Sequence, residues 1–341
     1  MVDSFINEYL LRNGPWQAME RAVARLMEHW DFRNVTLVGR TGDGGADIIA
    51  EKNDKRWVVQ VKFRQNEIIE KAAVDEVLKA TNIYRGDIPV IATNANINND
   101  LIKRRTELWG SGIPLQVWDR SFLKHIADKL NDISPKLSEP RPYQEEPISN
   151  IVERIKKGND RKGIIIMATG LGKTFVIGDS MRRLINESPK KLGRVLICAH
   201  TNAIVYQLEK SLWRFLPKGY STAVWNGNER GDVENSQIVL ACIDSVVNSL
   251  ESNTFPNDFG LLIIDEAHHA ANASYRSLVE YMKAGKPDGP FLVGMTATPW
   301  RSDEQDVKSL FGTPFCTIDI IEGMKNGYLT NVDYRMYLGD V

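Results

Sequence analysis

The stretch Met167-Ala-Thr-Gly-Leu-Gly-Lys-Thr174 decides how the rest of this sequence is interpreted. It follows Gly163-Ile-Ile-Ile-Met167, a run too short for a packed helix and typical of a buried parallel strand. Gly170 and Gly172 permit a turn whose backbone amides point inward, and a helix is predicted to begin at about Lys173. A strand, a loop and a helix in this order predict a binding site for the phosphates of a nucleotide.

Two side chains of this loop suit the same chemistry. Lys173 is placed to reach the β and γ phosphates of ATP, and the Thr174 hydroxyl is placed to ligate Mg²⁺. The strict P-loop pattern has glycine where Met167 stands, and a simple glycine turn is the ordinary alternative. A second motif is therefore needed to support a nucleotide site.

That second motif is Asp265-Glu-Ala-His268, which follows the apolar run Leu261–Ile264. Asp265 is expected to bind Mg·ATP through a water, and Glu266 is expected to polarise the attacking water. An acidic helix start is the alternative for this stretch alone. Because the two motifs occur together and in this order, nucleotide hydrolysis is the better interpretation.

The composition describes an ordinary globular protein. The chain has 341 residues, of which 43% are hydrophobic and 26% charged, with a net charge of −1. This length favours two or three domains, and the charge gives no sign of a generally basic nucleic-acid module. There is no membrane-length apolar run and no secretion signal, so a cytoplasmic protein without a membrane partner is expected. Cys198, Cys242 and Cys316 are expected to be reduced core residues.

An amphipathic helix is predicted after Pro15. Apolar residues at helical spacing give it one buried stripe, made of Trp16, Met19, Val23, Leu26, Met27 and Trp30. Glu20 lies at the edge of this stripe, where a carboxylate is either solvated or functional.

A β-hairpin is predicted to bring three polar side chains together. The extended segments expected after the helix are Val35–Arg40, Asp47–Glu51 and Trp57–Phe63. A turn centred after Asp54 pairs Asp47 with Lys62. It also pairs Ile49 with Gln60. Asp47, Gln60 and Lys62 therefore share one face of the hairpin.

Together with Glu20, these side chains form a plausible hydrolytic site with one metal ion. Asp47 would bind Mg²⁺, and Glu20 would complete the metal shell. Lys62 would orient the attacking water and stabilise the charge that develops on the phosphorus, and Gln60 would supply an oxygen. The alternative is a hairpin with polar residues on its solvated side.

Glu20, Gly42-Asp-Gly-Gly-Ala-Asp47 and Val59-Gln-Val-Lys62 resemble the PD-(D/E)xK nucleases, specifically the Mrr-type restriction endonuclease domain. The resemblance covers about residues 15–131 and implies a restriction-endonuclease-like αβββαβ fold with Mg²⁺-dependent DNA cleavage. Some members of this superfamily have lost catalysis. The elements expected after the hairpin are a helix near Glu67–Tyr84, a strand at Pro89–Thr93, a helix near Asn99–Trp109 and a strand at Leu115–Trp118.

The second half of the chain has the rhythm of a doubly wound parallel sheet. Strand-like runs at Val195–Ala199, Ile238–Cys242, Leu261–Ile264 and Phe291–Met295 alternate with helical stretches. The motifs follow strands directly, so they are expected to meet at one edge of the sheet. The predicted organisation is a nuclease domain at 1–131, a proline-containing linker at 132–142, an ATP-binding lobe at 143–325 and a connecting segment at 326–341.

Motifs along this half resemble those of superfamily 2 helicases, especially the motor subunits of type I and type III restriction enzymes. They are Arg141-Pro-Tyr-Gln144, Ala168–Thr174, Ala199-His-Thr201 with Gln207, Asp265–His268, and Thr296-Ala-Thr-Pro299 with Arg301. The resemblance implies a RecA-like first helicase lobe in which Gln144 reads adenine. It also implies that His268 and Thr296–Thr298 couple ATP hydrolysis to DNA movement, and that His200–Gln207 and Ile243–Ser245 contact the DNA backbone.

Superfamily 2 motors need a second RecA-like lobe that brings an arginine to the γ-phosphate, and no such lobe is found up to Val341. The expectation is an amino-terminal part of a longer motor, with the second lobe in cis or in trans. ATP hydrolysis by this stretch alone is expected to be weak, since an arginine finger contributes about 10³ to 10⁵ in rate.

The leading hypothesis is a restriction or phage-defence enzyme in which an ATP-driven DNA helicase or translocase carries an Mg²⁺-dependent endonuclease. The alternatives are a repair or remodelling motor whose nuclease-like domain only binds DNA, and a nucleotide-gated switch. A partner subunit that provides sequence specificity or senses methylation is also possible by family resemblance.

Overall fold

The structure, a computed structural model, describes residues 4–38, 45–64, 72–250, 254–269, 272–297 and 304–330. These residues fold into two compact units. The first unit combines the chain up to Glu139 with Val205–Leu240, and the second combines Pro140–Ile204 with the chain from Ala241 onward. The segment Val205–Leu240, which lies within the ATP-binding lobe in the sequence-based division, thus packs with the first unit.

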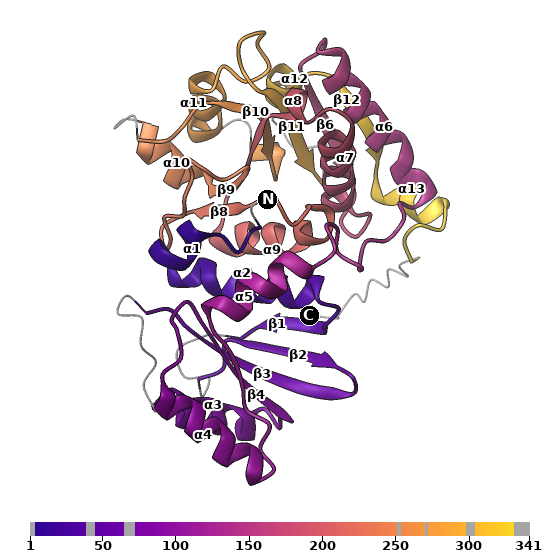
Figure 1. The fold of residues 1–341 in the computed structure, drawn as a ribbon. Coiled ribbons are helices and arrows are strands. Elements are labelled where there is room, and N and C mark those ends of the chain that lie inside the picture. The colour runs from indigo at the N-terminus through magenta and orange to yellow at the C-terminus, as the bar shows by residue number, and fades with distance from the viewer. Residues whose placement is uncertain are drawn as a thin grey trace, which may run out of the picture. The chain divides into compact units, whose positions relative to one another are not determined.

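The first unit contains a five-stranded mixed sheet whose strands follow chain order (Figure 1). The strands are β1 (Arg33–Leu37), β2 (Ile48–Lys52), β3 (Lys55–Lys62), β4 (Ile88–Thr93) and β5 (Gln116–Trp118). The helices are α1 (Glu8–Asn13), α2 (Trp16–His29), α3 (Ala72–Ile83), α4 (Asn99–Gly110) and α5 (Arg120–Lys129). Strands β1 to β3 pair antiparallel, and β3 to β5 pair parallel. The predicted αβββαβ order is confirmed.

The alternation of side chains along β3 decides what each face of this sheet carries. Val59 and Val61 belong to a core cluster that includes Met19 and Val23 of α2. A second cluster joins β4 and β5 to α3 and α4. The side chains of Gln60 and Lys62, which alternate with those of Val59 and Val61, therefore lie on the face of the sheet opposite to the one that packs on the apolar stripe of α2.

The predicted pairing of the hairpin is wrong by two residues. Ile48 pairs with Val59 and Ile49 with Val58, instead of the predicted pairs of Asp47 with Lys62 and Ile49 with Gln60. The reason lies in the turn, where Asn53 and Asp54 adopt φ angles of 53° and 57°. Asparagine and aspartate tolerate this left-handed conformation in two-residue hairpin loops. Because the shift is two residues, each side chain keeps its predicted face.

The predicted stripe of α2 is correct from Met19 onward and wrong at Trp16. Trp16 is the first residue of the helix and remains 55% exposed. The buried stripe begins one turn later, at Met19. Trp30, directly after the helix, is half-buried and lies 5.7 Å from the ring of Trp118.

A seven-stranded sheet has the order β12-β6-β11-β10-β7-β9-β8, and its pairs from β12 to β7 are parallel. Its strands are β6 (Lys162–Met167), β7 (Arg194–Ala199), β8 (Thr222–Trp225), β9 (Ile238–Cys242), β10 (Phe259–Ile264), β11 (Phe291–Thr296) and β12 (Pro314–Ile318). The accompanying helices are α6 (Pro142–Lys157), α7 (Lys173–Glu187), α8 (Pro189–Leu192), α9 (Asn202–Leu212), α10 (Ile243–Leu250), α11 (Ala273–Tyr281), α12 (Glu304–Phe311) and α13 (Ile320–Lys325), with short 3₁₀ turns η1 (Trp213–Phe215) and η2 (Ala267–His269). This is the predicted RecA-like doubly wound arrangement.

The strands β8 and β12 were not expected from the sequence. β12 pairs with the loop-bearing strand β6, and its Phe315 ring packs so closely on Gly163 that a Cβ there would lie 2.3 Å from it. Both Cys198 and Cys242 are buried and free, as expected, whereas Cys316 is half-buried. Among the described helices, none combines the length and apolar character needed to span a membrane.

Candidate functional site

Asp47 is held at the point where the hairpin of the first unit begins. Its backbone N–H donates to the Val59 carbonyl at 2.9 Å, and its carboxylate accepts from the Val61 N–H at 2.6 Å. The side chain therefore reaches across to β3, next to the positions of Gln60 and Lys62. The structure thus brings together the hairpin residues predicted for the hydrolytic site.

Glu76 of α3 connects Gln60 and Lys62. Its Oε2 accepts a hydrogen bond from Gln60 Nε2 at 2.8 Å and forms an ion pair with Lys62 Nζ. The hydrogen bond from Lys62 is also the main reason that the pKa of Glu76 lies below its usual value. Sequence reasoning missed Glu76. The available signal was a carboxylate next to the buried residue Val77 of α3, which is the same signal that identified Glu20.

The contact with Glu76 uses the NH₂ end of the Gln60 amide and turns its oxygen away from Glu76. A carboxylate only accepts hydrogen bonds, so it takes the NH₂ group of Gln60. Gln60 is 4% exposed, and its Oε1 has no hydrogen-bond partner among the residues that the structure describes. A buried acceptor without a donor is costly unless a ligand satisfies it.

The carboxyl groups of Glu20 and Asp47 interact with each other and have too little neighbouring positive charge to offset their burial. Burial raises the pKa of Asp47 to about 6, against the opposing effects of the Val61 N–H and of Lys62. Burial, and then the neighbouring Asp47 carboxylate, raise the pKa of Glu20 to about 8, and Arg21 only partly offsets this. Two half-buried carboxylates that repel each other suit a divalent cation between them.

These residues fit the Mg²⁺ that the sequence resemblance implies. The fit rests on two carboxylates, Glu20 and Asp47, and on the Gln60 oxygen, which has no partner within the described part of the chain. All three donors are oxygens, which is what Mg²⁺ prefers. Throughout the described ranges there is no cluster of three or more histidine, cysteine or acidic side chains arranged to hold a metal. The proposed set of Glu20, Asp47 and Gln60 therefore needs the Gln60 amide oxygen as its third ligand.

The loop after β6 has the geometry expected for a phosphate-binding loop. Gly170 and Gly172 both have a φ of 89°, a conformation that favours glycine, and α7 begins at Lys173 as predicted. The Lys173 ammonium donates to the Met167 carbonyl at 3.0 Å. Burial lowers the pKa of Lys173, while the carboxylates of Asp265 and Glu266 act in the opposite direction. Thr174 lies in the first turn of α7.

Gln144 is tied to this loop. Its Oε1 accepts from the Arg141 N–H at 2.9 Å, and its Nε2 donates to the Leu171 carbonyl at 2.9 Å. A Cβ on Gly172 would lie 2.6 Å from the same Nε2, so glycine is also needed there for space. Both ends of the Gln144 amide are therefore engaged within the protein. If Gln144 recognises adenine as expected, its hydrogen bonds to Arg141 and Leu171 must be replaced by hydrogen bonds to the base.

The acidic motif follows β10 directly. The Asp265 N–H donates to the Cys198 carbonyl at 2.9 Å, and burial raises the pKa of the Asp265 carboxyl. His268 Nδ1 lies 3.1 Å from a Glu266 carboxylate oxygen and 3.2 Å from the Thr296 hydroxyl. The strands β6, β11, β10 and β7 are consecutive neighbours in the sheet, so the loops that follow them meet at one edge. Gly42–Gly44, Thr298 and Arg301 lie outside the described residues.

Two family models match this chain. The model described as restriction endonuclease, of the Mrr catalytic domain, matches residues 11–125. The model described as type III restriction enzyme, res subunit, matches residues 137–301.

Individual relatives agree with these matches. The chain is 29% identical over 232 residues to the type I restriction enzyme EcoAI endonuclease subunit of Escherichia coli, a match that covers 65% of this chain and 27% of that protein. It is 30% identical over 210 residues to the putative ATP-dependent helicase IRC3 of Saccharomyces cerevisiae, covering 59% of this chain and 30% of that protein. The chain thus spans less than a third of the length of these relatives.

Among solved structures, the ATP-dependent type ISP restriction-modification enzyme LlaBIII bound to DNA aligns with 92% of this chain and 25% of its own, at 17% identity and a TM-score of 0.46. The first family match covers the nuclease-like motifs and the second covers the helicase-like motifs, in the order in which they occur along the sequence. The chain therefore carries a restriction endonuclease domain that matches the Mrr catalytic model and, after it, a helicase domain that matches the model described as type III restriction enzyme, res subunit.

Proposed function

We propose that this chain cuts DNA by Mg²⁺-dependent phosphodiester hydrolysis and couples that cleavage to ATP-driven movement along DNA, as part of a restriction or phage-defence system. The observation that carries the nuclease half is the set of Glu20, Asp47, Gln60 and Lys62, in which the buried Gln60 oxygen has no partner among the described residues and the two carboxyl groups of Glu20 and Asp47 have raised pKa values. A hairpin that only exposed polar residues to solvent would not bury an acceptor in this way.

Each residue of the nuclease site has a distinct task. Glu20, Asp47 and Gln60 Oε1 would hold Mg²⁺, which supplies Lewis-acid stabilisation of the charge on the scissile phosphate. Lys62, released from Glu76 when the phosphate enters, would orient the attacking water and stabilise the developing negative charge. Glu76 holds Lys62 and the Gln60 amide in place before substrate binds.

The nucleotide site has an equivalent division of tasks. Lys173 and the backbone amides around Gly170 and Gly172 would bind the phosphates of ATP. Thr174 and Asp265 would hold its Mg²⁺, and Glu266 would position the attacking water. A second RecA-like lobe, in cis or in trans, would supply the arginine, and we expect its addition to raise the rate of ATP hydrolysis by about 10³ to 10⁵.

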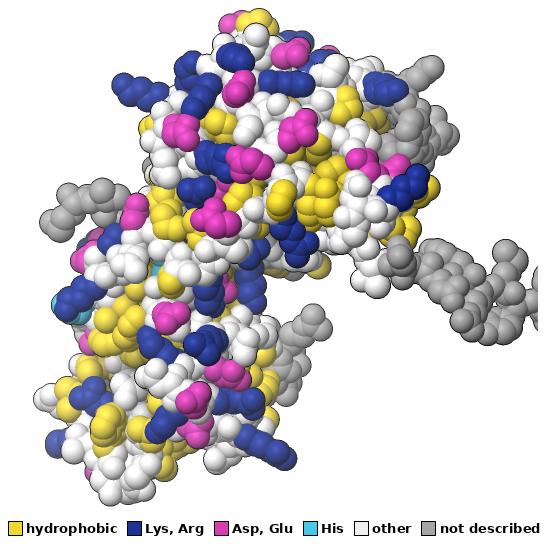
Figure 2. Space-filling model, turned by 90° about the vertical axis from the view of Figure 1, so that its right-hand side faces the viewer, with side chains coloured by type: hydrophobic (Ala, Val, Ile, Leu, Met, Phe, Trp, Pro, Cys, Tyr) yellow, Lys and Arg dark blue, Asp and Glu magenta, His cyan; other side chains and the backbone are white. Residues whose placement is uncertain are grey.

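Contacts with DNA are expected to be local. Lysine and arginine side chains are intermingled with acidic ones over the face shown in Figure 2, and the net charge of the chain is −1. Sequence-independent attraction to phosphates is therefore weak for the chain as a whole. Partner subunits that supply specificity or sense methylation, and a cytoplasmic location where DNA is accessible, belong to the same proposal.

The test is nicking of supercoiled plasmid with Mg²⁺ and without ATP. The wild-type chain should nick, and Asp47→Ala should lose at least about 100-fold in rate, because a metal ligand is removed. Equal activity of the two proteins would exclude the nuclease assignment and leave a DNA-binding module. Stimulation of ATP hydrolysis by DNA, measured on the same preparation, separates a motor from a nucleotide-gated switch.

A further inference from the structure

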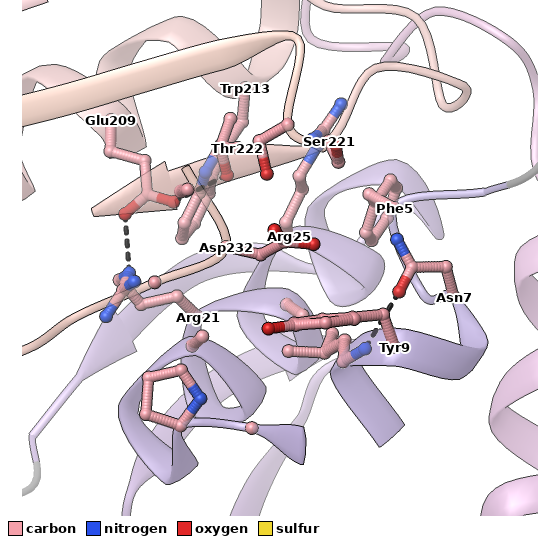
Figure 3. Close-up of a pocket in the computed structure, with 18 residues that line it drawn as sticks. Phe5, Asn7, Tyr9, Arg21, Arg25, Glu209, Trp213, Ser221, Thr222 and Asp232 are labelled. Carbon is pink, nitrogen blue, oxygen red and sulfur yellow. Dashed lines mark hydrogen bonds and ion pairs between the residues drawn. The ribbon is translucent and has the colours of Figure 1, made fainter. Parts of the chain in front are cut away.

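The residue after Glu20 on α2 is a buried arginine with two carboxylate partners. Arg21 is 6% exposed. Its Nη1 and Nη2 each donate to one carboxylate oxygen of Glu229 at 2.7 Å, and its Nε donates to Glu209 at 2.5 Å. Figure 3 shows the Arg21 and Glu209 side chains pointing toward each other at one side of a pocket lined by α1, α2 and the segment Val205–Leu240.

Both glutamates are themselves fixed. Glu209 also accepts a hydrogen bond from the Thr222 hydroxyl at 2.6 Å. The Glu229 backbone is held by Asn226, whose side-chain oxygen accepts from the Glu229 N–H at 3.0 Å and whose own N–H donates to the Glu229 carbonyl at 2.9 Å. The Arg21 guanidinium is thus bound to two carboxylates that cannot easily follow it if α2 rotates.

This arrangement is costly to disturb. Burial disfavours the Arg21 cation, but Glu209 and Glu229 together raise its pKa above the usual value. A buried charge that loses its partner is strongly destabilising. Because an α-helix has 3.6 residues per turn, Glu20 and Arg21 project about 100° apart from α2. Fixing Arg21 therefore fixes the direction in which Glu20 projects.

We propose that Arg21 is a positioning residue of the nuclease site, and that Glu209 and Glu229 act through it to hold Glu20 where it can bind a divalent cation. The inference rests on the proposed nuclease function and deepens it. Residues of the segment Val205–Leu240, which sequence motifs assign to the helicase domain, are then required for a complete metal site.

The position of Glu209 links this ion-pair cluster to the helicase motifs. Glu209 lies on α9, which begins at Asn202 and includes most of the stretch His200–Gln207, for which the helicase resemblance implies contact with the DNA backbone. A shift of α9 along or about its axis would move Glu209 and alter its bond to Arg21.

Arg25 provides a matched control. It lies one turn after Arg21 on the same helix and is 1% exposed. Its guanidinium also reaches the segment Val205–Leu240, but it donates to the backbone carbonyls of Leu216, Pro217 and Tyr220 rather than to carboxylates. A lysine at this position should lower stability without changing how Glu20 is held.

The experiment is a calorimetric titration of the whole chain with MnCl₂, without DNA or ATP. Glu229→Gln and Arg21→Lys should each weaken Mn²⁺ binding by about tenfold or more, the usual effect of removing a group that orients a metal ligand. The Mn²⁺ affinity of Arg25→Lys should stay within about twofold of that of wild type, although its melting temperature should fall about as much as that of Arg21→Lys. Wild-type affinity in Glu229→Gln and Arg21→Lys, or an equal loss in Arg25→Lys, would overturn the proposal.

Two further measurements distinguish failure of the positioning role from failure of the proposed nuclease site. In plasmid nicking, Glu229→Gln should raise the Mg²⁺ concentration for half-maximal rate while kcat recovers at saturating Mg²⁺, whereas partial unfolding would lower kcat alone. Asp47→Ala should abolish Mn²⁺ binding. If Asp47→Ala still binds Mn²⁺, the proposed nuclease site is wrong, and the positioning role is wrong with it. If Asp47→Ala loses Mn²⁺ binding but Arg21→Lys and Glu229→Gln bind Mn²⁺ as wild type does, only the positioning role is overturned.

Discussion

The Glu76 carboxylate accepts a hydrogen bond from Gln60 Nε2 at 2.8 Å and so decides which end of the Gln60 amide is left to act as a ligand. An amide has a donor end and an acceptor end of nearly equal shape, and only its partners distinguish them. With Glu76 on the NH₂ group, Oε1 is the atom without a partner among the described residues.

Replacing Glu76 by glutamine should weaken metal binding. The introduced amide could face Gln60 with either of its ends, so the Gln60 oxygen would no longer be favoured as the free end. Loss of an outer partner of a metal ligand costs about 10- to 100-fold in affinity. We expect this loss in Mn²⁺ calorimetry of Glu76→Gln. Glu107→Gln, which removes an exposed ion pair with Arg104 in the same unit, is the control and should bind Mn²⁺ normally.

Lys173→Ala should remove nucleotide binding. The ammonium now bonded to the Met167 carbonyl is the group expected to transfer to the phosphates. Calorimetry with a non-hydrolysable ATP analogue should show no measurable binding by the variant. Lys157→Ala, which loses only a surface pair with Glu153, should bind as wild type does. Equal affinity of Lys173→Ala and wild type would argue against the phosphate role.

Arg21→Ala should destabilise the first unit. It leaves Glu209 and Glu229 buried without their cation, which costs about 3 to 5 kcal/mol. Replacing all three residues by methionine should recover most of this stability, because no buried charge then remains. Urea unfolding measures both effects. If the triple variant were as unstable as Arg21→Ala, the cost would come from packing and not from unpaired charge.

The contribution of His29 to the stability of the first unit should fall between pH 7 and pH 4. Burial, and then the nearby Arg25 guanidinium, lower the pKa of His29 from 6.5 to about 4. The unfolded chain therefore binds a proton at a higher pH than the folded chain does. The stability linked to neutral His29 is fully present above pH 6.5 and is lost as the pH falls toward 4, to an extent of about 3 kcal/mol.

His29→Gln is the variant that tests this assignment. The free energy of unfolding of wild type minus that of His29→Gln, measured by urea titration at several pH values, should decrease from pH 7 to pH 4. Parallel curves for the two proteins would show that other groups cause the acid dependence.

The sequence by itself determined the motifs and the class of each domain. Glycines at 170 and 172, a lysine at the first helical position and a carboxylate pair after a buried strand permit few arrangements, because backbone conformation and strand periodicity are local properties. The face shared by Asp47, Gln60 and Lys62 was also predictable, since a period of two is insensitive to a shift of two residues.

Only the tertiary structure decided which distant groups meet. The turn at Asn53 and Asp54 set a pairing that pattern alone did not give, and β8 and β12 carry too weak a pattern to be found. The roles proposed for Glu76 and Arg21 depend on partners from other elements. Glu76 contacts Gln60 and Lys62. Arg21 contacts Glu209 and Glu229. A charged residue has the same appearance in a sequence whether it is solvated or buried, and its partner is chosen by the packing of the folded chain.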